Sequence, residues 1–158
     1  MINKILFVGR ATAETTTGWD HWAMISISEP VSALGEAKLL KGWDAVHRLE
    51  FHDIEAEMPG EPYVLLSEQE AQDLVNFVHC VASDVEGIIV HCRAGISRSA
   101  AVAKWIAEAY EIKFNHEYPH YNKHVYRLLV EANERRKERP SCLSNYASAS
   151  WKNKNQEE

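Results

Sequence analysis

Short apolar runs rich in β-branched residues alternate along the chain with segments whose apolar residues recur at helical spacing. The runs predict four strands, at residues 2–8, 23–28, 45–51 and 87–90. Three further segments predict helices, two amphipathic and one alanine-rich and buried: residues 68–82, 123–138 and 100–110. Strands that alternate with helices indicate an α/β domain with a largely parallel central sheet of about four to five strands, flanked by helices.

Helix-capping residues sharpen the predicted helix starts. Ser67 and Glu70 have the spacing of a capping box, in which each residue bonds the backbone of the other. Asn122 stands where an N-cap of the last helix is expected. The sequence Ser-Glu-Pro at 28–30 also predicts a helix start, and we expect a short helix from there to about residue 40.

Polar segments between these elements predict loops. We expect a loop at residues 10–22, in which Trp19 and Trp22 pack over the sheet. Residues 52–66 contain Pro and Gly among acidic residues and predict a long loop, and long ordered loops in compact domains are often functional. The segment 113–122 is polar and aromatic and predicts a connector between the last two helices.

Composition limits the class of protein. The 158 residues predict one domain at 1–140, and a Ser-, Asn- and Lys-rich segment at 141–158 predicts a weakly ordered tail. With 17 basic and 23 acidic residues the net charge is −6, which argues against broad nucleic-acid or anionic-membrane binding. No apolar run predicts a membrane span or a signal peptide. Three scattered cysteines fit a reducing cytoplasm, so we expect a cytoplasmic protein.

The candidate chemistry lies in the nine residues His-Cys-Arg-Ala-Gly-Ile-Ser-Arg-Ser at 91–99. They join a predicted buried strand to a predicted buried helix. Backbone N–H groups and the positive end of the helix dipole make such a junction an anion site, and a cysteine placed there is biased towards thiolate. Arg98 lies six positions after Cys92 and can return its guanidinium to the same loop.

These nine residues resemble the signature His-Cys-x5-Arg-Ser/Thr of the cysteine-dependent protein tyrosine phosphatases. The rest of the chain looks like the small dual-specificity type, in its compact bacterial and viral form. The resemblance implies that Cys92 attacks phosphorus, that Arg98 clamps phosphoryl oxygens and that Ser99 bonds the sulfur when it departs. It also implies that His91 orients the loop, and that substrate contacts come from the remaining signature residues: Arg93, Ala94, Gly95, Ile96 and Ser97.

A phosphatase of this kind needs an acid that protonates the leaving oxygen. Asp53 follows a predicted strand and lies on the long loop, at the edge of the sheet where Cys92 is also expected. The loop is expected to move over the site. Glu55 and Glu57 occupy the same loop and remain alternatives.

The expected function is therefore metal-independent hydrolysis of phosphomonoesters through a cysteinyl-phosphate, by a monomer acting on a phosphorylated protein or peptide and needing no cofactor. The alternatives are the same chemistry on phosphoinositide or RNA 5′-phosphate, and an inactive phosphopeptide-binding relative. His116, His120 and His124 recur every four residues, but Pro119 interrupts the segment and favours a polar surface over a metal site. Cys80 is expected to pack, with a disulfide to oxidised Cys92 as the other possibility.

Overall fold

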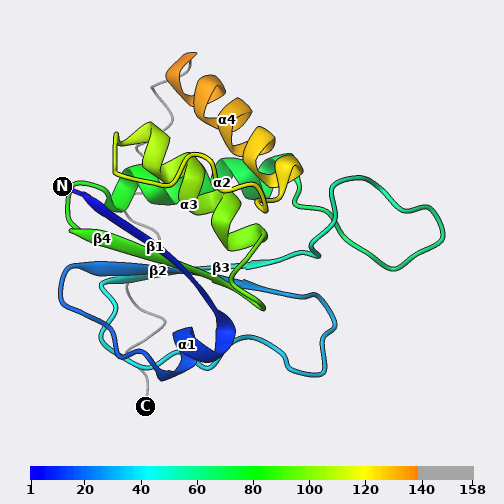
Figure 1. Ribbon diagram of the computed structural model, residues 1–158, viewed down its shortest axis with the longest axis horizontal. Coiled ribbons are helices and arrows are strands. Elements are labelled where there is room, and N and C mark those ends of the chain that lie inside the picture. The colour runs from blue at the N-terminus through cyan, green and yellow to red at the C-terminus, as the bar shows by residue number, and fades with distance from the viewer. Residues whose placement is uncertain (139–158) are drawn as a thin grey trace.

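The computed structural model describes residues 1–138 (Figure 1). The predicted tail at 141–158 lies outside the described residues. The described chain forms eight elements: β1 (Lys4–Gly9), α1 (Arg10–Thr15), β2 (Trp22–Ser28), β3 (Ala45–Glu50), α2 (Glu68–Val81), β4 (Gly87–Cys92), α3 (Arg98–Ala109) and α4 (Lys123–Glu138).

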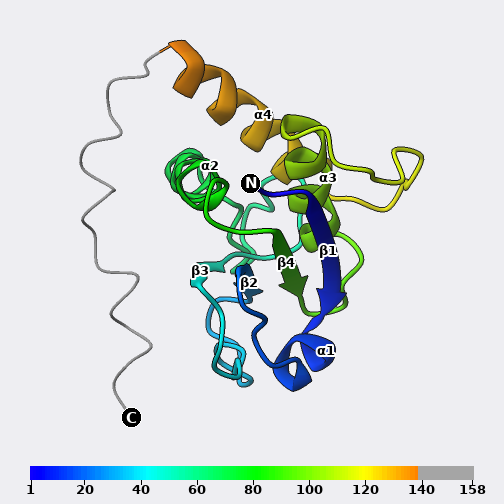
Figure 2. The ribbon, with the colours of Figure 1, turned by 90° about the vertical axis from the view of Figure 1, so that its left-hand side faces the viewer.

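The four strands form one sheet in the order β1-β4-β2-β3, and all neighbouring pairs are parallel. This confirms the predicted α/β class. The register pairs Gly9 with Cys92 and Ser28 with Glu50, so the strands end at a common edge. Figure 2 shows the arrows of β1 and β4 pointing towards the same end. In open parallel sheets, ligands bind beyond this carboxyl edge, and here the residues that follow all four strands meet there.

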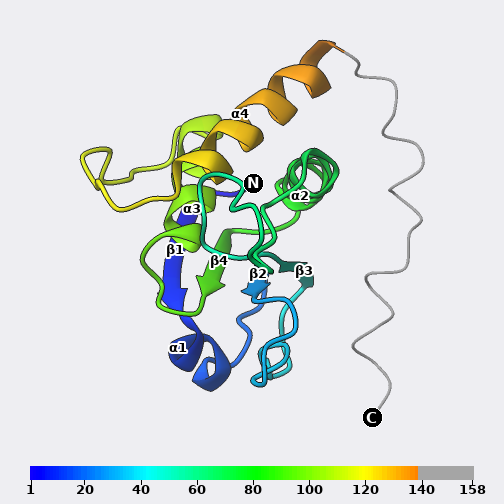
Figure 3. The same ribbon diagram turned by 90° about the vertical axis from the view of Figure 1, so that its right-hand side faces the viewer.

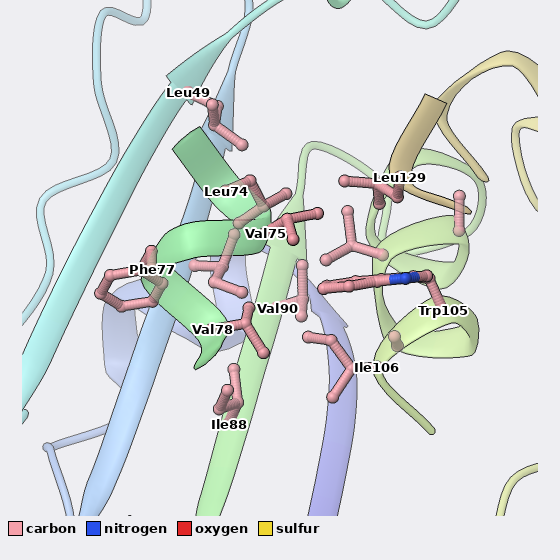
Figure 4. Packing of buried hydrophobic residues seen from close by; sticks show 14 of the residues in the cluster. Leu49, Leu74, Val75, Phe77, Val78, Ile88, Val90, Trp105, Ile106 and Leu129 are labelled. Atoms are coloured by element: carbon pink, nitrogen blue, oxygen red, sulfur yellow. The ribbon is translucent and has the colours of Figure 1, made fainter. Parts of the chain in front are cut away.

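Helices α2, α3 and α4 cover one face of the sheet, and α1 lies on the other side (Figures 1 and 3). The larger core lies under the three helices and draws on alternate residues of the strands, such as Ile88 and Val90 of β4 (Figure 4). The intervening Ile89 faces the opposite side, where it packs with Met24 and with Ala13 of α1. The central strands are therefore buried on both faces, as expected for a parallel sheet.

Two sequence predictions for the first third of the chain were wrong. Residues 10–15, expected as a loop, form α1, and no helix occurs between residues 28 and 40. Arg10 joins the two segments: it begins α1, pairs with Glu14 four residues on, and its guanidinium donates to the carbonyls of Leu34, Gly35 and Glu36. Those carbonyls are held by a side chain, and Gly35 has a φ of +58°, so the segment forms turns.

The tryptophan prediction was right for one residue and wrong for the other. Trp22 is buried at the start of β2, a strand position instead of a loop position, while Trp19 stays 44% exposed and packs edge-on against it. The caps predicted at Ser67 and Asn122 are confirmed, whereas the helix start predicted at Ser28 is absent. Ser67 and Glu70 form the capping box of α2, and Asn122 Oδ1 accepts from the N–H of Val125 at the start of α4.

Within residues 1–138, no helix has both the length and the apolar character needed to cross a membrane.

Candidate active site

The signature segment occupies the turn from β4 into α3. Cys92 is the last residue of β4, residues 93–97 form the loop, and Arg98 is the first residue of α3. The side chains of Cys92, Arg98 and Ser99 are all buried. Because β4 is a central strand, the loop lies at the middle of the carboxyl edge and is flanked by the segments that follow β1 and β2. The predicted strand, loop and helix context is confirmed.

Hydrogen-bond donors surround the sulfur of Cys92. Ser99 Oγ lies 3.2 Å from Sγ, and the backbone N–H of Gly95 donates to Sγ over 3.3 Å. Burial alone would raise the pKa of the thiol. The Ser99 hydroxyl, the N–H groups of Ser99 and Gly95, and the charge of Arg98 outweigh burial and lower the pKa of Cys92 below its ordinary value. Cys92 is therefore a nucleophile biased towards thiolate.

Gly95 allows the loop to pack on the end of β1. Its φ is +71°, in the left-handed region that favours glycine. A Cβ built on Gly95 would lie 2.3 Å from the backbone nitrogen of Gly9 and 2.4 Å from the carbonyl carbon of Val8. Arg10 N–H also donates to the carbonyl of Arg93. Gly95 therefore adopts a backbone turn that other residues rarely adopt, and the close approach that it permits is to the backbone of β1.

Arg98 is 3% exposed and two of its three nitrogens have protein partners. Nη1 donates to the carbonyl of Phe51 over 2.7 Å, and Nη2 lies 3.2 Å from a carboxylate oxygen of Glu29. The Nε–H group is buried and has no acceptor in the described part of the chain. Leaving such a donor unpaired costs about 1–3 kcal/mol, so an acceptor at the Nε–H of Arg98 would be favourable.

Glu29 is a site residue that the sequence reasoning missed. Its second carboxylate oxygen lies 3.4 Å from Nη1 of Arg93, so one carboxylate bridges the two arginines of the signature. From the sequence, Glu29 was expected only at the start of a helix after β2. No helix forms there, and the carboxylate turns instead to the neighbouring loop. Its location at the carboxyl end of an adjacent parallel strand is the feature of the sequence that could have indicated a site residue.

His91 is fully buried and belongs to a chain of hydrogen bonds on the face of the sheet opposite to that of Cys92. Its Nδ1 lies 3.4 Å from the carbonyl of Cys92, and its Nε2 lies 2.7 Å from Ser26 Oγ. A carbonyl only accepts, so we assign the proton to Nδ1, and Ser26 then donates to Nε2. Arg48 Nη1 donates to the same Ser26 oxygen. Burial lowers the pKa of His91 to about 4, so the ring is neutral near pH 7 and orients the loop without carrying charge.

Asp53 lies against the signature loop. Its Oδ1 accepts from Ser97 Oγ over 2.8 Å and from Asn122 Nδ2 over 2.8 Å. Of the two alternative acids, Glu55 accepts from the backbone N–H of Lys123 and so caps α4, while Glu57 is exposed on the loop. The structure therefore brings Asp53 to the loop through Ser97.

The remaining signature residues form the outer surface of the loop. Arg93, Ala94 and Ile96 are exposed, and the Ile96 carbonyl accepts from the hydroxyl of Tyr118 over 2.8 Å. Burial and the nearby charge of Cys92 raise the pKa of Tyr118, so this phenol stays a donor. The connector before α4 thus borders the loop.

The three histidines spaced by four face different partners. His116 lies 3.8 Å from the Glu108 carboxylate, His120 packs edge-on against Tyr118, and His124 Nε2 donates to the carbonyl of Leu66. Within residues 1–138, no three side chains of His, Cys, Asp or Glu are grouped to hold a metal ion. Cys80 is a half-buried free thiol on α2, and Cys92 is a buried free thiol. A disulfide between them on oxidation, the alternative to simple packing, stays untested.

Comparison with known proteins adds no family assignment. A scan against protein-family models gives no match, and a search of curated proteins gives none either. The resemblance of residues 91–99 to the phosphatase signature therefore stays a prediction. The contacts of Cys92, Arg98 and Asp53 are the grounds on which a function can be assigned.

Proposed function

We propose that the protein hydrolyses phosphomonoesters through a cysteinyl-phosphate intermediate, acting as a tyrosine or dual-specificity phosphatase on phosphorylated protein or peptide. One observation carries the proposal. A buried thiol with a lowered pKa lies at a helix N-terminus beside an arginine whose Nε–H has no protein acceptor within residues 1–138. A phosphoryl group is the ligand that uses both, because phosphorus accepts the thiolate and its oxygens accept from the guanidinium.

The first step transfers the phosphoryl group to the enzyme. The Cys92 thiolate attacks phosphorus, the S–P bond forms and the bond to the ester oxygen breaks. Arg98 Nε–H and the backbone N–H groups of the loop bind the charge on the equatorial oxygens. Asp53 in its carboxylic acid form gives its proton to the departing oxygen, so the product leaves as an alcohol or phenol.

The second step releases phosphate. Water attacks the phosphorus, Asp53 now accepts a proton from that water, and the S–P bond breaks. Ser99 Oγ, 3.2 Å from the sulfur, donates to the departing thiolate and lowers the cost of its charge. The thiolate is thereby restored. Neither step, as proposed, uses a metal ion.

Hydrolysis of aryl phosphates in the presence of EDTA tests this proposal. The wild-type protein should retain activity with EDTA, and Cys92→Ser should lose it while keeping the fold. Asp53→Asn should lower kcat about 10²- to 10⁴-fold on phenyl phosphate, whose leaving group needs a proton, and much less on p-nitrophenyl phosphate. Activity that EDTA abolishes, or that survives in Cys92→Ser, would contradict the mechanism.

A further inference from the structure

Asn122 is a buried residue that hydrogen-bonds three segments, two through its side chain and one through its backbone. It is 1% exposed and precedes α4. Its Oδ1 accepts from Val125 N–H, and its Nδ2 donates both to Asp53 Oδ1 over 2.8 Å and to the carbonyl of Ile54 over 3.1 Å. Its own backbone N–H donates to the carbonyl of Ser97 in the signature loop. One residue therefore joins α4, the loop after β3 and the signature loop.

Helix capping explains only half of these contacts. An N-cap needs a side-chain oxygen that accepts from the first turn, and Ser, Asp and Asn serve about equally well. The amide NH2 is what distinguishes Asn122, and both of its hydrogen bonds go to the segment that carries Asp53. The capping role would leave this amide group without a purpose.

The loop that carries Asp53 is also closed at its base. His52 N–H donates to the carbonyl of Val64 over 2.8 Å, and Val64 N–H donates to His52 Nδ1 over 2.9 Å. Asp53 is the first residue of the excursion that these two bonds close, so it lies next to the closure. Asp53 is held from two sides, by Ser97 of the signature loop and by Asn122.

We propose that Asn122 is a positioning residue that fixes Asp53 beside the signature loop before substrate binds. This inference rests on the proposed function, in which Asp53 is the general acid. The contact of Asn122 with the signature loop is made by its backbone N–H, which a substitution of the side chain leaves in place, so its side-chain amide acts on the site through the segment that carries Asp53. The acid is then preformed in the site, in place of arriving by closure of a mobile loop.

The substitution Asn122→Ser separates positioning from capping. Serine retains an oxygen that caps α4 but has no NH2 group that reaches Asp53. We expect kcat on phenyl phosphate to fall about ten- to hundredfold, kcat on p-nitrophenyl phosphate to change less than threefold, and KM to stay nearly constant. In an Asp53→Asn background, the same substitution should cause no further loss, because the residue through which it acts is already inactive.

Asn133→Ser is the matched control, because Asn133 is a second buried asparagine of α4 and its side chain contacts His79 far from the loop. It should lower stability while leaving the ratio of the two substrates unchanged. Equal losses of Asn122→Ser on both substrates, or a further loss in the Asp53→Asn background, would overturn the positioning role.

A measurement that needs no turnover completes the test. Hydrogen exchange at the N–H groups of His52 and Ile54 should be faster in Asn122→Ser than in the wild type, and unchanged in Asn133→Ser. Unchanged exchange in Asn122→Ser would show that Asn122 does not hold the segment that carries Asp53, and would overturn the proposal. If the wild-type protein hydrolyses no aryl phosphate, the proposed function and the catalytic role of Asn122 are both wrong. If the exchange result still holds in that case, Asn122 is a structural link between α4 and the loop after β3.

Discussion

The hydroxyl of Ser99 offers a direct measurement of how the site stabilises the thiolate. Ser99→Ala removes the oxygen 3.2 Å from Cys92 Sγ and leaves in place the two backbone N–H donors and the charge of Arg98. A hydrogen bond to a charged group contributes about 1.5–3 kcal/mol. We therefore expect the pKa of Cys92 to rise, so that at pH values below the titration the thiolate population falls about ten- to hundredfold.

Absorbance of the thiolate near 240 nm, followed against pH, reports this change without requiring activity. The same curve for Cys92→Ser is subtracted, because it contains the contribution of the other thiols. The Ser99→Ala curve should move to higher pH, since one of the donors to the sulfur is lost. A curve that coincides with the wild type would refute the assignment of the hydroxyl as a donor to the thiolate.

Two further predictions concern charge in and around the site. Burial holds the pKa of His91 at about 4 in the folded state, against 6.5 in the unfolded state. The free energy of unfolding is therefore unaffected by this residue above pH 6.5 and falls as the pH falls towards 4. Linkage gives a loss of about 2 kcal/mol by pH 5. Urea unfolding at pH 7.5 and pH 5 should show this loss in the wild type and a smaller one in His91→Gln, and equal losses would contradict it. Glu29→Gln keeps an oxygen for Arg98 Nη2 but removes a negative charge from the anion site, so orthophosphate should bind about fivefold more tightly, for a gain of about 1 kcal/mol. Calorimetric titration measures this affinity, and weaker binding would show that the carboxylate positions Arg98 more than it repels phosphate.

The elements predicted with success are those whose signals are local in the sequence. The capping box at Ser67 and the cap at Asn122 follow from residue types at fixed spacing, and the strand before Cys92 from a run of β-branched residues. Helix α1 has six residues, and its N-cap, Gly9, offers no side-chain cap. Its contacts with the rest of the fold are the burial of Ala13 and the hydrogen bonds of Arg10 to a distant segment. Neither contact can be predicted from the residues of the helix alone.

The same distinction applies to the site. Cys92, Arg98 and Ser99 are recognisable because one loop carries them all, and the parallel sheet places Asp53 at the same edge. The bridge from Glu29 to both arginines depends on how two loops pack, and the amide contacts of Asn122 depend on where α4 begins relative to the loop after β3. Side-chain contacts between separate loops are set by tertiary packing, so sequence spacing alone did not reveal them.

The close approach of Gly95 to the backbone of Val8 and Gly9 makes the signature loop depend on the first strand. Among the described residues, β1 is an edge strand whose one partner in the sheet is β4, and the two are far apart along the chain. Closing the long loop between them costs about 4 kcal/mol in conformational entropy, and the contacts that β1 makes in the folded protein must offset this cost. The loop cannot take its shape until β1 is in place. The reactivity of Cys92 is therefore a chemical reporter of folding, and a thiol that titrates at its ordinary pKa would mark molecules whose first strand has not joined the sheet.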